Sequence, residues 1–181
     1  MVVDVQERLA PAIVGGASAV ERIGLVIDAA VALRIPVLAS EQYPQGLGPT
    51  VAELATRLPQ SARLAKTHFS CLREPDFAAR WSALGRSQVL VCGMEAHVCV
   101  LQTALDFLAA GIETFVLADG VGSRREDNRT LALQRLAAAG AIPLPAESAI
   151  FEWLEDSDNP AFRSLIARIR DSGLAEGKAS R

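Results

Sequence analysis

Short apolar runs alternate with longer helical patterns along the chain, and this alternation constrains the fold more than any other feature. The runs carry almost no charge at their centres, as expected of strands that helices cover on both faces of a sheet. Strands that are joined by helices run parallel, with right-handed crossovers. The sequence therefore predicts an α/β fold, a Rossmann-like three-layer α/β/α sandwich with a six-stranded parallel sheet, from the runs 1–3, 36–40, 62–67, 87–93, 113–120 and 141–145.

The helical segments between these runs carry signals for where each helix begins. Ser18 and Glu21 have the spacing of a capping box, which predicts a helix start at Ser18. Pro75 occupies a favoured first helical position. Asp127 or Asn128 is expected to cap the helix that precedes the last strand.

The composition limits the size of the domain and the classes of partner. With 181 residues, 50% of them hydrophobic, the chain fits one compact domain over residues 1–174, followed by a polar tail, 175–181, that we expect to be frayed. The formal net charge of -3 offers no basic excess for the phosphates of a nucleic acid. No run approaches the roughly 20 apolar residues of a membrane span, and no signal-peptide pattern is recognisable. We expect neither a nucleic acid nor a membrane as partner.

The cysteines and histidines are few. Cys71, Cys92 and Cys99 form an odd set without CxxC spacing, which predicts reduced thiols and a cytoplasmic location. Cys92 is interpreted as a core residue and Cys71 as a loop thiol without a role. His68 and His97 are too scattered for a zinc site, so no metal is expected. No GxGxxG motif follows a strand, so no dinucleotide cofactor is expected.

Cys99 stands where a buried strand turns into a helix, in the run VLVCGMEAHVCVLQT. A thiol in the first turn of a helix lies near free N–H groups and the positive end of the helix dipole. Both favour the thiolate, which is the nucleophilic form. A pKa lowered from about 8.5 to near 7 would make roughly half of the thiol reactive at neutral pH.

Two further ionisable residues end predicted strands. Asp4 follows the first run and Lys66 lies near the end of the third. Their side chains would meet Cys99 at the carboxyl edge of the sheet if the three strands are neighbours. A lysine there stabilises a thiolate, and a carboxylate can shuttle a proton. The pattern leaves open that Asp4 is a strand-end cap, Lys66 a surface charge and Cys99 a small buried apolar side chain.

Three segments carry a resemblance to a known family. They are VVDVQERL, AKTHFSCL and VCGMEAHVCVLQTALDFLAAG, and their order and spacing match the isochorismatase-like cysteine hydrolases over nearly the whole chain. The segments EQYPQGLG and GMEAHVCVLQT most resemble the subgroup of isochorismatase domain-containing proteins. The resemblance implies that Asp4, Lys66 and Cys99 form a catalytic triad. It also implies a cis peptide bond between Glu95 and Ala96, and an oxyanion hole formed by the N–H groups of Ala96 and Cys99.

Two departures from the family pattern refine the expected reaction. Nicotinamidases of this family bind a metal through an Asp-x-His motif after the second strand, where this chain has Glu41, Gln42 and Tyr43. True isochorismatases carry glycine at the position of Cys99. The resemblance therefore implies a hydrolase that cleaves an amide-like C–N bond of a small molecule through a thioester, without a cofactor. The alternatives are a catalytically silent scaffold or thiol sensor and, less compatible with the missing glycine motif, a nucleotide-binding protein.

Several residues near the predicted edge are weaker candidates for substrate contact: Gln6, Leu9, Tyr43, Phe69 and His97. Tyr43 belongs to the glycine- and proline-rich loop EQYPQGLGP, where open α/β sheets bind ligands. The resemblance also implies a homo-oligomer, a dimer or higher. Trp153 is expected to line a pocket or an interface or to be packed in the core. Four arginines are possible anchors for an anionic substrate group, but the sequence does not distinguish them from surface charges: Arg8, Arg73, Arg124 and Arg125.

Overall fold

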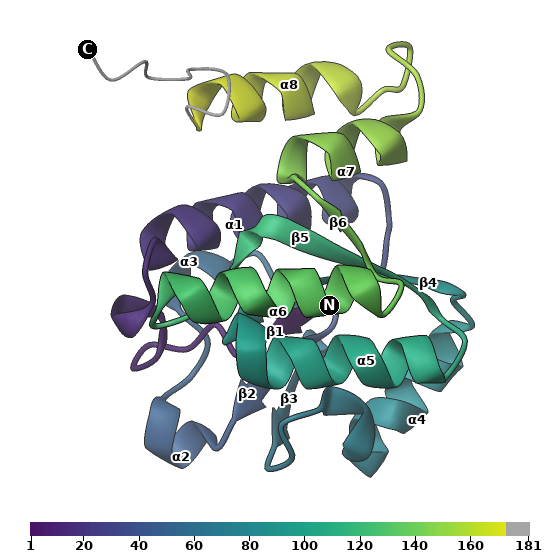
Figure 1. The fold of residues 1–181 in the computed structure, drawn as a ribbon. Coiled ribbons are helices and arrows are strands. Elements are labelled where there is room, and N and C mark those ends of the chain that lie inside the picture. The colour runs from purple at the N-terminus through teal and green to yellow at the C-terminus, as the bar shows by residue number, and fades with distance from the viewer. Residues whose placement is uncertain (173–181) are drawn as a thin grey trace.

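A computed structural model describes residues 1–172 of the chain, so the tail 175–181 lies outside the described residues. Six strands form one sheet in the order β3-β2-β1-β4-β5-β6 (Figure 1). Every neighbouring pair is parallel, which confirms the predicted architecture. The strands are β1 (Val2–Val3), β2 (Ala39–Gln42), β3 (Arg63–Lys66), β4 (Gln88–Met94), β5 (Glu113–Gly122) and β6 (Ile142–Leu144).

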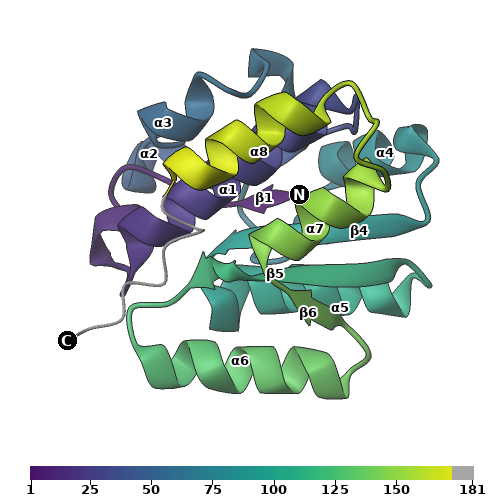
Figure 2. The same cartoon turned by 90° about the horizontal axis from the view of Figure 1, so that it is seen from above.

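Helices cover both faces of the sheet, as the view from above shows (Figure 2). One core lies beneath α1 (Gly16–Ala32), α3 (Ala52–Ala55), α7 (Ala146–Leu154) and α8 (Phe162–Asp171). The other lies beneath α4 (Pro75–Leu84), α5 (Leu101–Ala109) and α6 (Glu126–Ala138). Short turns complete the chain: α2 (Pro44–Leu47), η1 (Ala10–Ala12), η2 (Gln60–Ala62), η3 (Cys71–Arg73) and η4 (Ala96–Val100). Among the described residues, none of the helices combines the length and the apolar character that crossing a membrane requires.

The strand order places a topological switch point between β1 and β4. The chain builds β1, β2 and β3 outward in one direction and then returns to add β4, β5 and β6 on the other side of β1. Val3 of β1 pairs with Gly93 of β4. Open α/β sheets bind ligands beyond the carboxyl ends of the strands at such a point. Asp4, directly after β1, and the turn after β4 therefore lie at the expected position for a site.

Two predicted helix starts are wrong by a few residues. The capping box at Ser18 does not form, because α1 already begins at Gly16 after Gly15, which has a left-handed backbone and no side-chain cap. Helix α6 begins at Glu126, before both predicted caps. The carboxylate of Asp127 instead binds Arg125 at 2.8 Å. The start of α4 at Pro75 is confirmed.

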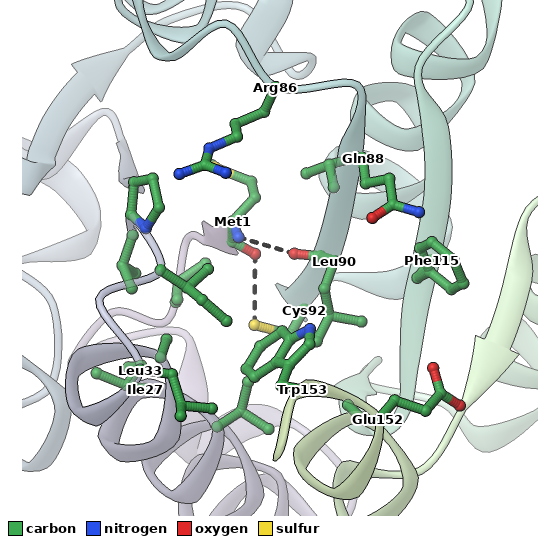
Figure 3. A pocket seen from close by; sticks show the side chains of 18 of the residues that line it. Met1, Ile27, Leu33, Arg86, Gln88, Leu90, Cys92, Phe115, Glu152 and Trp153 are labelled. Atoms are coloured by element: carbon green, nitrogen blue, oxygen red, sulfur yellow. Dashed lines mark hydrogen bonds between the residues drawn. The ribbon is translucent and has the colours of Figure 1, made fainter. Parts of the chain in front are cut away.

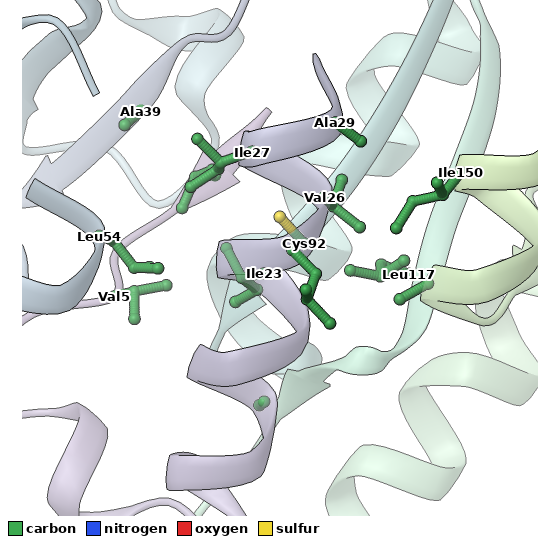
Figure 4. Close-up of a cluster of buried hydrophobic side chains, with 14 of the residues drawn as sticks. Val5, Ile23, Val26, Ile27, Ala29, Ala39, Leu54, Cys92, Leu117 and Ile150 are labelled. Carbon is green, nitrogen blue, oxygen red and sulfur yellow. The ribbon is translucent and has the colours of Figure 1, made fainter. Parts of the chain in front are cut away.

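The core beneath α1 holds Cys92, as predicted (Figure 4). The Cys92 thiol donates to the carbonyl oxygen of Met1 at 3.4 Å, and burial raises its pKa to about 11. A cavity of about 760 Å³ lies beside it at the amino ends of the strands, with Trp153 in its wall (Figure 3). This cavity is at the edge of the sheet opposite to Asp4, Lys66 and Cys99.

Candidate functional site: a buried aspartate, lysine and cysteine at the switch point

Asp4 is completely buried at the carboxyl end of β1. Its φ of 51° is left-handed, a conformation that is uncommon outside glycine and that clusters at functional sites. Ser40 of β2 holds the carboxylate, since its hydroxyl donates to Oδ1 at 2.7 Å. The backbone N–H of Asp4 also donates to the carbonyl oxygen of Ser40, at 3.1 Å. The side chain is therefore fixed from the neighbouring strand.

Lys66 reaches Asp4 across the end of β2, with its Nζ 2.8 Å from Oδ2 of the carboxylate. Three carbonyl oxygens accept hydrogen bonds from the ammonium: Gln42 Oε1 at 2.5 Å and the backbone oxygens of His68 and Phe69, each at 3.1 Å. We call these three oxygens the lysine cradle. An ammonium has three hydrogens, which the lysine cradle and the Asp4 carboxylate share.

The other oxygen of Asp4 faces Lys66. Oδ2 is buried, and the Lys66 ammonium lies 2.8 Å from it. A carboxylate oxygen can accept two hydrogen bonds. Oδ2 can therefore accept a further hydrogen bond from a group placed against it.

Cys99 supplies such a group. It lies in the π-helical turn η4, between β4 and α5, and is 6% exposed. Its thiol lies close enough to Asp4 and Lys66 for both to act on its pKa, so the three predicted residues do meet. The expected low pKa of the thiol is wrong. Burial raises the pKa of Cys99 above its ordinary value, the charge of Asp4 raises it further, and Lys66 opposes both without overcoming them.

The charge state of Lys66 follows from the same cluster. Burial alone would lower the pKa of its ammonium. The contacts around the ammonium outweigh burial, the charge of Asp4 foremost, so the pKa of Lys66 is raised. The raised pKa values keep both groups protonated at rest, Lys66 as an ammonium and Cys99 as a thiol.

The turn before Cys99 contains a cis peptide bond between Met94 and Glu95. It stands one residue earlier than the predicted bond between Glu95 and Ala96. The carbonyl oxygen of Glu95 accepts from the N–H groups of Val98 and Val100, at 3.1 and 3.3 Å. Within residues 1–172 the N–H groups of Glu95 and Ala96 donate to no backbone or side-chain acceptor. Both remain available to an oxyanion.

His97 is held within the protein. Its Nδ1 lies 3.0 Å from the buried hydroxyl of Ser123, and its Nε2 lies 3.4 Å from Nδ2 of Asn128. Both ring nitrogens therefore have partners, and the ring ties the turn η4 to the segment after β5. Glu95 makes a second tie there, because its carboxylate accepts from the backbone N–H of Arg124 at 2.9 Å and pairs with its guanidinium.

The other residues predicted to contact the substrate differ in how deeply they are buried. Gln6 is fully buried and its amide is used internally: Nε2 donates to the carbonyl oxygens of Gln42 and Gly48, and Oε1 accepts from the N–H of Gln42. Gln6 therefore has a structural position rather than a free polar group. Leu9 is half-buried against the core. Tyr43 and Phe69 are exposed, at 58% and 52%.

Sequence reasoning missed two polar residues of the cluster. Ser40 and Gln42 alternate at the end of β2, the strand that separates Asp4 from Lys66. Period-two alternation places both on one face of the sheet. Cys71 lies in the turn η3, in the connection between β3 and α4, and its burial was not predicted. Cys71 is fully buried, and its backbone N–H donates to the Thr103 hydroxyl at 3.1 Å. Burial raises the pKa of its thiol, and the charge of Asp4 raises this pKa further.

The arginines that were considered as anion anchors are engaged in contacts within the protein. Arg73 pairs with Asp106, Arg125 with Asp127 and Arg124 with Glu95. Arg8 donates to the carbonyl oxygen of Gly46 at 2.7 Å. As for metals, no group of three or more His, Cys, Asp or Glu side chains in residues 1–172 is arranged to hold an ion.

The fold and the site together define a parallel α/β protein with a buried Asp-Lys-Cys cluster at its switch point. Comparison with protein families then gives a match to the isochorismatase domain over residues 1–148. The chain belongs to the isochorismatase-like family, and its relatives place it with the isochorismatase domain-containing proteins.

Two of those relatives illustrate the similarity. The chain is 37% identical over 179 residues to isochorismatase domain-containing protein 2A of Mus musculus, covering 94% of this chain and 84% of that protein. It is 38% identical over 180 residues to isochorismatase domain-containing protein 1 of Salmo salar, covering 98% of this chain. The chain spans 62% of the length of the Salmo salar protein.

Solved structures have the same fold. The MAR1 ribonuclease from Caenorhabditis elegans superposes with a TM-score of 0.87 at 36% identity, covering 97% of this chain and 92% of that chain. The YcaC gene product of Escherichia coli, described as an octameric hydrolase of unknown specificity, superposes with a TM-score of 0.88 at 24% identity. It covers 96% of this chain and 88% of that chain.

Proposed function

We propose that this chain is a cysteine hydrolase that cleaves an amide-like C–N bond of a small molecule through a thioester on Cys99. The observation that carries the proposal is the buried carboxylate of Asp4, whose Oδ2 lies 2.8 Å from the Lys66 ammonium and which is close enough to Cys99 to act on the pKa of its thiol. A weak nucleophile is activated when a base within hydrogen-bond reach takes its proton as it attacks.

In the first half of the reaction, Asp4 takes the thiol proton while the Cys99 sulfur attacks the carbonyl carbon. The N–H groups of Ala96 and Cys99 bind the oxyanion, and the free N–H of Glu95 lies in the same turn. Protonated Asp4 then gives its proton to the leaving nitrogen. The C–N bond breaks, the amine departs and the thioester remains on Cys99.

In the second half, the Asp4 carboxylate accepts a proton from water as the water oxygen attacks the thioester carbon. The C–S bond breaks, the acid product forms and the proton returns to the sulfur. Lys66 stays protonated throughout, because the charges around it raise its pKa. It offsets the negative charge that passes between sulfur and carboxylate.

The test is a screen of simple amides, carbamoyl compounds and ureas for the release of ammonia or amine. We expect turnover by the wild type, loss of turnover in Cys99→Ala, and a Cys99-bound acyl group detected by intact-mass spectrometry. Cys92→Ala is the matched control, since Cys92 lies in the opposite core and should retain turnover. Turnover that persists in Cys99→Ala would contradict the mechanism.

One observation favours a second candidate, a silent scaffold or thiol sensor. Cys99 is only 6% exposed, and the triad residues line neither the cavity at the amino edge nor the smaller one beside α1. A sensor would react with small oxidants and alkylating agents but hydrolyse nothing. Reaction of Cys99 with hydrogen peroxide, together with no turnover across the whole screen, would favour this second function.

The substrate is proposed as a small molecule although three structural neighbours are described as MAR1 ribonucleases, two of them as putative ones. RNA binding relies on neutralising backbone phosphates with cations. This chain has a net charge of -3, and the arginines considered above are engaged in contacts within the protein. Incubation with single-stranded and structured RNA belongs in the screen. RNA cleavage that is lost in Cys99→Ala would replace the amide substrate with RNA.

The assembly and the location are also proposals. The octameric description of the YcaC neighbour and the family resemblance support a homo-oligomer, which sedimentation velocity would test. A monomer at micromolar concentration would contradict it. The three cysteines are free in the structure, which supports a reducing, cytoplasmic location.

A further inference from the structure

Glu74 makes a set of contacts that the proposed reaction does not use. It is the residue before α4, and its side chain is 19% exposed. One oxygen, Oε1, accepts from the backbone N–H of Thr67 at 2.6 Å and from that of His68 at 2.8 Å. The same oxygen contacts the Thr67 hydroxyl at 3.2 Å and Nδ1 of His68 at 2.9 Å.

These contacts fix the segment that follows Lys66. The lysine cradle takes two of its three oxygens from this segment, the carbonyls of His68 and Phe69. Its third oxygen belongs to Gln42, whose Nε2 donates to the carbonyl oxygen of Thr67 at 2.8 Å. Thr67 is therefore held on its N–H side by Glu74 and on its carbonyl side by Gln42.

The charge of Glu74 suits this task. Accepting the N–H groups of His68 and Thr67 lowers its pKa to about 2, so the carboxylate is ionised at any pH at which the protein would act. Hydrogen bonds to an ionised acceptor are about twice as strong as those between neutral groups. Within residues 1–172, no lysine or arginine pairs with Glu74, so its contacts serve the segment alone.

We propose that Glu74 is a positioning residue for Lys66. It acts through the backbone of Thr67 and His68 to hold the lysine cradle in place. The lysine cradle in turn keeps the ammonium against Asp4 and Cys99. This inference rests on the proposed function, because it assigns Glu74 a role in the same site.

The experiment measures how fast iodoacetamide alkylates Cys99, resolved from Cys71 and Cys92 by peptide mass spectrometry, at a fixed pH of about 8.5. Glu74→Ala releases the lysine cradle, so the ammonium stabilises the thiolate less and alkylation slows, by up to about tenfold for a pKa shift of up to one unit. Loss of a negative charge by itself would favour the thiolate and speed the reaction. A slower rate therefore does not come from the lost charge itself.

Two matched variants separate the contacts of Glu74 from its charge. Glu74→Gln keeps an oxygen that can accept from Thr67 and His68, so we expect most of the wild-type rate. Asp76→Asn removes a carboxylate from the first turn of the same helix, where the carboxylate makes no hydrogen bond or ion pair with residues 1–172, and should leave the rate unchanged.

A double-mutant cycle with Lys66→Met decides the proposal. If Glu74 acts through Lys66, adding Glu74→Ala to Lys66→Met leaves the rate the same within about twofold. Equal slowing in both backgrounds means that the segment controls access to the sulfur, and this overturns the proposal. If Lys66→Met clearly slows alkylation and Glu74→Ala does not, the role of Glu74 is also overturned, and the proposed function remains intact. No effect of Lys66→Met itself contradicts both.

Discussion

The Nζ atom of Lys66 lies 2.8 Å from Oδ2 of Asp4 although their strands are not neighbours, since β2 separates β3 from β1. The lysine side chain spans that strand. At the end of β2, Ser40 donates a hydrogen bond to Asp4 and Gln42 accepts one from Lys66. Both charged side chains are almost completely buried, at 2% and 0% exposure. A carboxylate and an ammonium removed from water to this degree depend on each other for stability.

This dependence predicts a large loss of stability when one partner is removed. Lys66→Met leaves the buried Asp4 carboxylate without a counter-charge, which costs about 3–5 kcal/mol for pairs of this kind. Removing both charges in Lys66→Met with Asp4→Asn should cost less than Lys66→Met alone, because no unpaired charge remains. Urea denaturation at neutral pH measures both values.

The matched control is a salt bridge on the surface. Arg125 and Asp127 are 2.8 Å apart, but their side chains are 72% and 58% exposed. Exposed pairs contribute little because water and salt screen them. Arg125→Met should therefore leave the urea midpoint unchanged. A loss in Lys66→Met that is no larger than in Arg125→Met would show that the buried pair is not a coupled unit.

The second prediction concerns the reactivity of the thiol. Burial and the negative charge of Asp4 raise the pKa of Cys99. Asp4→Asn removes the charge, so the pKa falls toward its ordinary value and alkylation at neutral pH becomes faster, by about tenfold for each unit of pKa. Hydrolysis should nevertheless be lost, because the acceptor of the thiol proton is gone. The rates of alkylation and turnover are measured on the same preparation.

This pair of opposite effects distinguishes a general base from a group that merely supports the fold. Ser40→Ala is the companion variant, since it keeps Asp4 but removes the 2.7 Å hydrogen bond to Oδ1. It should reduce turnover without a comparable gain in alkylation. If Asp4→Asn slows alkylation instead, the carboxylate does not raise the pKa of the thiol and the assignment is wrong.

The fold was readable from the sequence because its signals are local and repeated. Six uncharged apolar runs separated by helices leave few arrangements other than a parallel sheet covered on both faces. The order of the strands was not readable, because it depends on where the chain reverses its direction of growth. The helix starts at Ser18 and Asp127 were misplaced because Gly15 and Arg125, neither of which provides a side-chain cap, occupy the observed N-cap positions.

The meeting of Asp4, Lys66 and Cys99 was predictable from the sequence, whereas the electrostatics of the cluster was not. Asp4, Lys66 and Cys99 each follow or end a strand and were placed together on that ground. The turn after β4 suggested a lowered thiol pKa, yet the desolvation of Cys99 outweighs what the turn and Lys66 supply. Burial depends on packing from distant segments, including Cys71 and Ala132 in the same core, which no local pattern reports.

The third prediction follows from the buried thiol of Cys92. Its pKa is raised to about 11 by burial, whereas in the unfolded chain it has an ordinary pKa of about 8.5. Between these values the unfolded chain releases the proton and the folded protein retains it. The folded state is then penalised, so stability is complete below about pH 8.5 and falls as the pH rises toward 11.

The loss from one thiol is about 3 kcal/mol across this window. Urea denaturation at a series of pH values measures it, and Cys92→Ala should make the decline shallower even though its cavity lowers stability at neutral pH. An alkaline decline that Cys92→Ala leaves unchanged would assign the effect to other groups, of which Cys71 and Cys99 also have raised pKa values.

The last prediction concerns Gly93, which sits in β4 against β1 at the switch point. Its φ is +120°, and a Cβ at this position would lie 2.0 Å from the carbonyl oxygen of Val3 and 2.7 Å from its backbone nitrogen. Both atoms belong to the backbone that leads into Asp4, so they cannot move aside without displacing the carboxylate. Gly93→Ala should therefore cost about 3–5 kcal/mol, at the upper end of single-residue effects, and abolish turnover.

Gly85 provides the control for backbone conformation alone. It also has a positive φ, +59°, but a Cβ there would meet nothing within 4 Å. Gly85→Ala should cost only about 1–2 kcal/mol, the penalty of a left-handed alanine, and should leave turnover intact. Urea denaturation and the turnover assay compare the two variants directly. Equal losses of stability would mean that the clash with Val3 is relieved by small shifts and that Asp4 does not depend on the close contact of β4 with β1.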